Sequence, residues 1–248
     1  MLRFQIALAA ALSLATAARA APDFKGAHAD LQQKKKIGSD ECHSVPNGQF
    51  KTVCEMKHHK QVALAICTSK SGKDYGPKGA APGRLFKKVY SAAECANEIK
   101  AELAALAALG KDGLTVVPHE PTPVTLTFSD GHVEYKDTSA YLVEWIPGTE
   151  VKLCPSGSDN EEAVLKQVAS LVEAAGKLTL PHRKVLLADL EKLHKHVLKS
   201  PIPDLQGIVD STTGHFFLMD PFTGPVTATL KQCAEHVGKA LDGVHALK

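Results

Sequence analysis

Six cysteines follow a secretory type of N-terminus, and this combination limits what the chain can fold into more than any other feature. Residues 1–20 begin with a short basic segment, continue through an apolar run and end in Ala18-Arg19-Ala20, a small-residue pattern that signal peptidases read. The apolar run is too short to cross a bilayer as a helix. We therefore expect residues 1–20 to be a signal peptide, cleaved after Ala20, and the mature protein to be secreted and extracellular.

All the cysteines lie beyond the expected cleavage site, and an even number in an oxidising compartment predicts disulfides and no free thiol. Two pairings compete near the N-terminus. Cys54 and Cys67 lie symmetrically about a turn at Lys60-Gln61, whereas Cys42 and Cys54 lie on either side of a turn at Asn47-Gly48. The sequence leaves the connectivity open for the full set, Cys42, Cys54, Cys67, Cys95, Cys154 and Cys233.

The charge balance argues against nucleic-acid and membrane partners. The chain has 29 lysines and arginines against 27 aspartates and glutamates. Residues 1–20 contain Arg3, Arg19 and no acidic residue, so the mature chain carries equal numbers of basic and acidic side chains. A neutral chain has no electrostatic reason to bind a polyanion, and we expect neither nucleic acid nor membrane as a partner.

The first half of the mature chain predicts strands with a single helix. Residues 21–36 are polar and lysine-rich and are expected to form a flexible leader. The continuous apolar run from Val62 to Cys67 predicts a strand buried on both faces. Ser91 and Glu94 form a capping box that begins a helix, and Gly110 ends it. Further strands are expected at residues 114–117, 124–128, 132–135 and 140–146.

The second half is mostly helical. Helices are predicted from about 159 to 176, from 180 to 198 and from 227 to 247, with a strand pair at 207–209 and 216–219. Strands with one helix followed by helices predict an α+β fold in two lobes. The N-terminal lobe, residues 37–147, is expected to be an antiparallel sheet with one helix, and the shortened C-terminal lobe, residues 148–248, to be mostly helical.

The motifs of the N-terminal part, taken in order, resemble those of a protein kinase. The segment that includes Gly38 and Val45 lies where kinases have the glycine-rich loop G-x-G-x-x-G-x-V, with Asp40 and His43 in place of the second and third glycines. The third-strand motif V-A-I-K is matched by Val-Ala-Leu-Ala, so Ala65 replaces the lysine. The resemblance implies that Gly38 and Val45 border a nucleotide cleft.

The resemblance continues through the helix and the segment that joins the lobes. The capped helix takes the place of kinase helix C, with Glu98 or Glu102 as its ion-pair glutamate. Residues 141–148 resemble the hinge that contacts adenine, which makes Glu144 and Ile146 candidate cleft residues. Trp145, the only tryptophan, is expected either to line the cleft or to pack between the lobes.

Two aspartates complete the resemblance in the C-terminal part. Asp204 lies in Ile-Pro-Asp-Leu, where kinases have His-Arg-Asp-Leu, and is the candidate catalytic aspartate. Asp220 lies where Asp-Phe-Gly belongs and is the candidate metal ligand. Few residues follow Asp220, so the chain resembles a minimal kinase fold of the kind found among secreted effectors.

The resemblance implies a pseudokinase. Phosphoryl transfer needs backbone amides over the phosphates, a lysine on them and a metal held by Asp and Asn. Here the lysine is replaced, two loop glycines are missing, and Val209 stands where the asparagine is due. We therefore expect a secreted, catalytically impaired scaffold that binds a protein partner, with no cofactor.

Two alternatives remain open. The first is an active atypical kinase that uses ATP and Mg²⁺ with a relocated lysine, supplied by Lys70, Lys73, Lys87 or Lys88. The second is a disulfide-stabilised secreted binding protein that has no relation to kinases.

Overall fold

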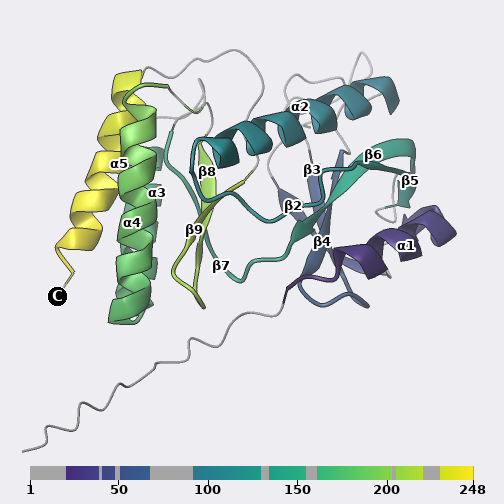
Figure 1. The fold of residues 1–248 in the computed structure, drawn as a ribbon, viewed down its shortest axis with the longest axis horizontal. Coiled ribbons are helices and arrows are strands. Elements are labelled where there is room, and N and C mark those ends of the chain that lie inside the picture. The colour runs from purple at the N-terminus through teal and green to yellow at the C-terminus, as the bar shows by residue number, and fades with distance from the viewer. Residues whose placement is uncertain are drawn as a thin grey trace, which may run out of the picture.

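The computed structural model of this chain describes residues 21–38, 41–47, 51–67, 92–129, 134–154, 161–200, 202, 205–219 and 230–247, with the side chains of 42–47, 51, 52 and 230 outside that description. The expected signal peptide lies outside the described residues. The helices are α1 (Phe24–Lys34), α2 (Ala92–Lys111), α3 (Glu161–Lys177), α4 (Leu180–Val197) and α5 (Leu230–His245). The strands are β1 (Lys36–Gly38), β2 (Cys42–Asn47), β3 (Lys51–Met56), β4 (Val62–Cys67), β5 (Val124–Ser129), β6 (Glu134–Glu144), β7 (Gly148–Lys152), β8 (Gln206–Asp210) and β9 (Phe216–Met219). The predicted α+β class is confirmed (Figure 1).

The first six strands form one sheet in the order β1-β5-β6-β4-β3-β2. Strands β2 to β6 pair with their neighbours in antiparallel fashion, and β1 pairs in parallel with β5. The sheet is therefore mixed, and the expectation of a purely antiparallel sheet is wrong at its β1 edge. Of the other expected strands, residues 114–117 form only an isolated bridge between Val116 and Leu218, and 132–146 contribute the single long strand β6.

Strand β4 is buried over its whole length, as its continuous apolar sequence predicts. Val62, Leu64 and Ile66 pack into a core that also contains residues of α1, and the alternating residues Ala63, Ala65 and Cys67 pack into a core shared with α2. Since successive side chains of a strand point to opposite faces, α1 and α2 cover opposite faces of the sheet (Figure 1).

The segment 21–36, expected to be a flexible leader, contains helix α1. Asp23 caps this helix by accepting a hydrogen bond from the Gly26 backbone N–H at 2.9 Å. Ala27 and Leu31, one helical turn apart, are buried against the sheet. The sequence contains this helical spacing of apolar residues, but the segment is mostly polar and rich in lysine, which favours the prediction of a flexible leader. The first sheet thus carries two helices, not the single helix expected.

Strands β7, β8 and β9 form a separate antiparallel sheet, and helices α3, α4 and α5 pack together beside it (Figure 1). The predicted helices and the predicted strand pair of this half are all present, with small shifts at their ends. Their buried side chains form one core, which includes Leu171 of α3, Leu190 of α4, Val237 of α5 and Phe216 of β9.

Two disulfides are described. Cys67 at the end of β4 is bonded to Cys95 in α2, and Cys154 after β7 is bonded to Cys233 in α5. The first bond therefore fixes α2 to β4, which it packs beside, and the second fixes α5 to the segment that follows β7. Cys54 is also disulfide-bonded, and no free cysteine occurs in the described part of the chain.

The proposed Cys54–Cys67 bond is wrong, because Cys67 is bonded to Cys95. The expected hairpin register was also wrong. Cys54 lies opposite Leu64 and Cys67 lies opposite Lys51, because the β3–β4 turn comes earlier in the chain than Lys60-Gln61 predicted. The competing Cys42–Cys54 pair involves a side chain outside the described residues.

We expect acid to destabilise the fold through the buried His236 of α5. Burial, helped by the nearby Lys239, lowers the pKa of His236 from its ordinary value of 6.5, and the opposing effects of Glu161, Glu235 and a backbone hydrogen bond with Leu153 are smaller. Its Nδ1 is buried without a hydrogen-bond partner among the described residues. His236 therefore takes up a proton more readily in the unfolded chain than in the folded one. The free energy of unfolding consequently falls as the pH drops through 6.5 toward the lower pKa of the folded state.

The measurement is urea unfolding of residues 21–248 between about pH 7.5 and pH 5, the range in which histidine titrates. The variant His236→Gln should show a flatter dependence of stability on pH than the unmodified chain. The matched control His58→Gln removes an exposed histidine and should keep the original slope. An unchanged slope in His236→Gln would contradict the assignment.

Candidate functional site

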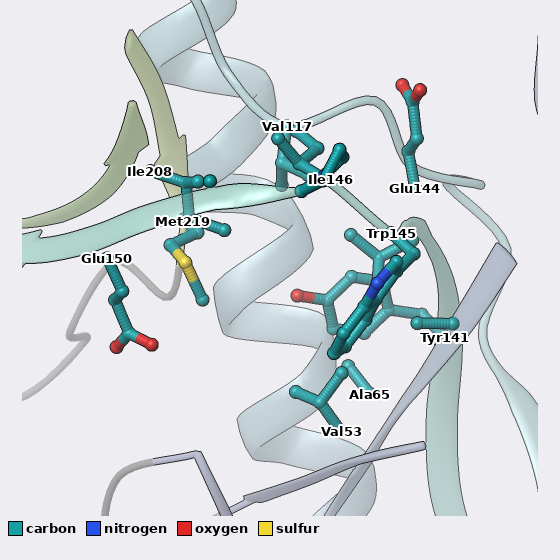
Figure 2. A pocket seen from close by; sticks show the side chains of 14 residues that line it. Val53, Ala65, Val117, Tyr141, Glu144, Trp145, Ile146, Glu150, Ile208 and Met219 are labelled. Carbon is teal, nitrogen blue, oxygen red and sulfur yellow. The ribbon is translucent and has the colours of Figure 1, made fainter. Parts of the chain in front are cut away.

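A cavity of about 220 Å³ lies where the two sheets meet at the segment that joins β6 to β7. Its walls come from both sheets and from this linking segment, residues 145–147 (Figure 2). The lining residues are Val53, Ala63, Ala65, Val117, Tyr141, Val143, Glu144, Trp145, Ile146, Pro147, Gly148, Glu150, Ile208 and Met219.

The hollow exists because β4 presents small side chains to it. Ala63 and Ala65 lie on the face of β4 turned toward the cavity, whereas the opposite face carries the larger Val62, Leu64 and Ile66. The alanine methyl groups are short, so they leave open the space that longer side chains at these two positions would fill. The position expected to carry the kinase lysine, Ala65, is therefore part of an apolar wall.

Tyr141 occupies the space beside Ala65. The two residues are directly paired across β4 and β6, so their side chains lie on the same face of the sheet. The Tyr141 hydroxyl donates a hydrogen bond to Glu102 Oε1 of α2 at 2.6 Å, and both side chains are buried. The ring of His119 meets the Tyr141 ring edge-on, with centroids 6.3 Å apart. A tyrosine phenol thus contacts the buried glutamate of α2.

The linking segment is held on both sides by backbone hydrogen bonds. The Trp145 N–H donates to the Gln61 carbonyl at 2.8 Å, and the Pro147 carbonyl accepts from the Ser211 N–H at 3.1 Å. Gly148 follows, and a Cβ there would lie 2.1 Å from the Val209 carbonyl oxygen. Only glycine allows β7 to approach β8 this closely, so the cavity has a fixed backbone at its linking edge.

The cleft residues predicted from the sequence divide into two groups. Glu144 and Ile146 line the cavity, although the Glu144 carboxylate is directed away from Tyr141 and Trp145 (Figure 2). Gly38 does not line it: this residue lies in β1, at the opposite edge of the sheet from β2, and its N–H donates to Glu41 Oε2. Val45 lies in β2 with its backbone paired to Val53, and its side chain is outside the described residues.

On α2, the glutamate that faces the sheet is Glu102. Glu98 is exposed, whereas Glu102 is only 5% exposed and accepts the Tyr141 hydrogen bond. The difference follows from the helical period, because Glu102 follows the buried Ile99 by three residues and precedes the buried Leu106 by four.

Both candidate aspartates, Asp204 and Asp220, lie outside the described residues. The described neighbour of Asp220 in the sequence is Met219, which ends β9 and lines the cavity. The described residues contain no group of three or more His, Cys, Asp or Glu side chains placed to hold a metal ion.

A second polar cluster, which the sequence did not indicate, surrounds Asp189 of α4. This buried carboxylate accepts hydrogen bonds from the Thr115 hydroxyl at 2.8 Å and from the Phe216 N–H at 3.1 Å, and it contacts His215 Nδ1 at 2.8 Å. The cluster joins α4 to β9 and to the segment after α2. Because these hydrogen bonds connect separate elements of the fold, we interpret the cluster as structural.

We expect Tyr141→Phe to destabilise the fold by about 1–3 kcal/mol, because it removes a donor from a buried carboxyl group. Replacing both partners with apolar side chains, Tyr141→Phe with Glu102→Leu, should cost less than the sum of the two single changes. Urea unfolding of the four proteins provides the double-mutant cycle. Strict additivity would show that the hydrogen bond contributes nothing to stability.

No protein-family model matches the sequence, and no curated protein matches it. The resemblance to protein kinases therefore stays a prediction from the order of motifs in the sequence.

Proposed function

We propose that this protein is a secreted, kinase-like binding protein without phosphotransferase activity, which acts by binding a protein partner. Several features support the kinase-like part. Along the chain, helix α2 follows the first three antiparallel strands of the sheet, β2, β3 and β4, and precedes the next two, β5 and β6. A short linking segment then leads to a second sheet, and the cavity lies between the two. The order of strands, helix and linking segment is the order that the resemblance implies, whereas strand β7 directly after the linking segment was not expected from the sequence.

The observation that carries the loss of activity is the pairing of Tyr141 with Glu102. In kinases, a lysine on the third strand binds the phosphates and forms an ion pair with the helix C glutamate. Here Ala65 stands at the lysine position, and its cross-strand neighbour Tyr141 donates a hydrogen bond to the glutamate. A neutral phenol stabilises the buried glutamate but supplies no positive charge for a triphosphate.

The charges at the cavity support the same conclusion. Among the lining residues that the structure describes, the charged ones are Glu144 and Glu150, both acidic. Phosphoryl transfer depends on positive charge placed around the transferring group, and losing one preorganised donor typically costs about 10²–10³ in rate. The described lining lacks that charge, which favours a binding role over catalysis.

The extracellular location is supported by the cysteines together with the sequence of residues 1–20. Two described disulfides and a bonded Cys54 are typical of oxidising compartments. None of the helices in the described ranges is long and apolar enough to cross a bilayer. Disulfides of this kind would stabilise the protein outside the cell. A secreted protein of this type could act as an effector by binding a partner protein.

We expect MgATP at millimolar concentration to leave the melting temperature of the mature chain unchanged. A ligand at about 100 times its Kd would stabilise the fold by about 2.7 kcal/mol and raise Tm by roughly 5–10 °C. Thermal unfolding with MgATP, with Mg²⁺ alone and with AMP measures this directly. Incubation with radiolabelled ATP should leave the chain and generic protein substrates unlabelled.

A shift of several degrees with MgATP, lost in Asp220→Ala, would establish a metal–nucleotide site and contradict the proposal. Label incorporation that disappears in Asp204→Ala would favour the active-kinase alternative. Both substitutions leave Tyr141 and Glu102 themselves unchanged.

A further inference from the structure

We propose that the cavity between the two sheets binds a small, flat, uncharged aromatic molecule. This inference depends on the cavity itself and not on the kinase resemblance, which would place a highly charged nucleotide there. It adds a ligand to the protein-binding role proposed above.

The walls of the cavity are suited to an aromatic ring. Val53, Ala65, Tyr141 and Trp145 lie on one side of the hollow, and Ile208 and Met219 on the other (Figure 2). Aromatic rings offer stacking or edge-on contacts to a flat ligand, and a methionine sulfur also contacts aromatic rings favourably. Small-molecule sites are typically concave and lined mostly by apolar and aromatic side chains, as this cavity is.

The volume sets the size of the ligand. The cavity holds about 220 Å³, less than the roughly 300 Å³ at which pockets for drug-sized molecules begin. One or two fused rings fill such a space. The linking segment is fixed by the Trp145–Gln61 and Ser211–Pro147 hydrogen bonds, so this edge of the cavity is already formed before a ligand binds.

The charged residues that the structure describes around the cavity favour an uncharged ligand over an anionic one. No lysine, arginine or histidine is among the lining residues that the structure describes. The Glu144 carboxylate is directed away from the aromatic side chains, and Glu150, an exposed residue of β7, adds a negative charge at the margin (Figure 2). An anion moved from water into this apolar space would lose hydration without gaining a positively charged partner.

The chain contains a single tryptophan, Trp145, and it lines the cavity. Its fluorescence is therefore a specific reporter of the site. The probes are 1-aminonaphthalene and 4-amino-1-naphthalenesulfonate, which share the same fused rings and differ by one sulfonate group. Both accept energy from an excited indole, so a bound probe quenches Trp145.

With residues 21–248, we expect saturable quenching by 1-aminonaphthalene and an affinity at least about tenfold lower for the sulfonate. In the Glu150→Gln variant the two affinities should lie closer together, because the variant should bind the sulfonate more tightly and 1-aminonaphthalene as tightly as before. The absence of saturable quenching, or equal affinity for the two probes, would overturn the proposal whatever the result with MgATP.

Two variants locate the binding. Val53→Phe adds a ring to the half-buried β3 wall and should weaken 1-aminonaphthalene binding at least about tenfold. The matched control Thr125→Phe adds the same ring at an exposed position of β5, outside the cavity lining, and should leave the affinity unchanged. If Val53→Phe does not fold, Ala65→Val fills the β4 wall with two more methyl groups and should have the same effect. Unchanged affinity in a folded filling variant would place the probe elsewhere.

Discussion

The burial of β4 on both faces is the constraint on which the rest of the first sheet depends. One face carries Val62, Leu64 and Ile66 and packs with α1, while the other carries Ala63, Ala65 and Cys67 and packs with α2. The large residues are buried in the core on their side. The alanines leave space on theirs, and the cavity occupies it. The same alternation therefore gives a dense core on one face and a binding space on the other.

Helix α2 is fixed to this sheet at two points. The Cys67–Cys95 disulfide holds its N-terminal half to the end of β4, and the Tyr141–Glu102 hydrogen bond holds its middle to β6. A buried glutamate is costly unless it is hydrogen-bonded, and the phenol meets that requirement without adding a charge. Both attachments are internal to the chain and join α2 to two different strands of the sheet.

The cavity lining and the Asp189 cluster differ in chemical character. Around the cavity the described lining is apolar with two acidic residues, whereas the hydrogen-bonded group at Asp189 lies in the C-terminal half and ties α4 to β9. Electrostatic stabilisation of a triphosphate needs fixed positive charge, and apolar contact with a flat ring does not. The composition of the cavity wall thus favours recognition of an apolar ring.

The sequence alone determined the α+β class, the doubly buried β4 and the helices of the C-terminal half, because hydrophobic period and helix-ending residues are local signals. It placed Glu144 and Ile146 in the segment that borders the cavity, and the kinase resemblance aligned Ala65 with a lysine. It missed α1, whose apolar face is narrow, and it misplaced the β3–β4 register, which is set by pairing across the sheet. Only the tertiary structure decided that Cys67 bonds Cys95, that Glu102 and not Glu98 faces the sheet, and that Tyr141 lies beside Ala65. These are contacts between residues far apart in the chain, and they depend on how strands and helices pack in space, which no local pattern specifies.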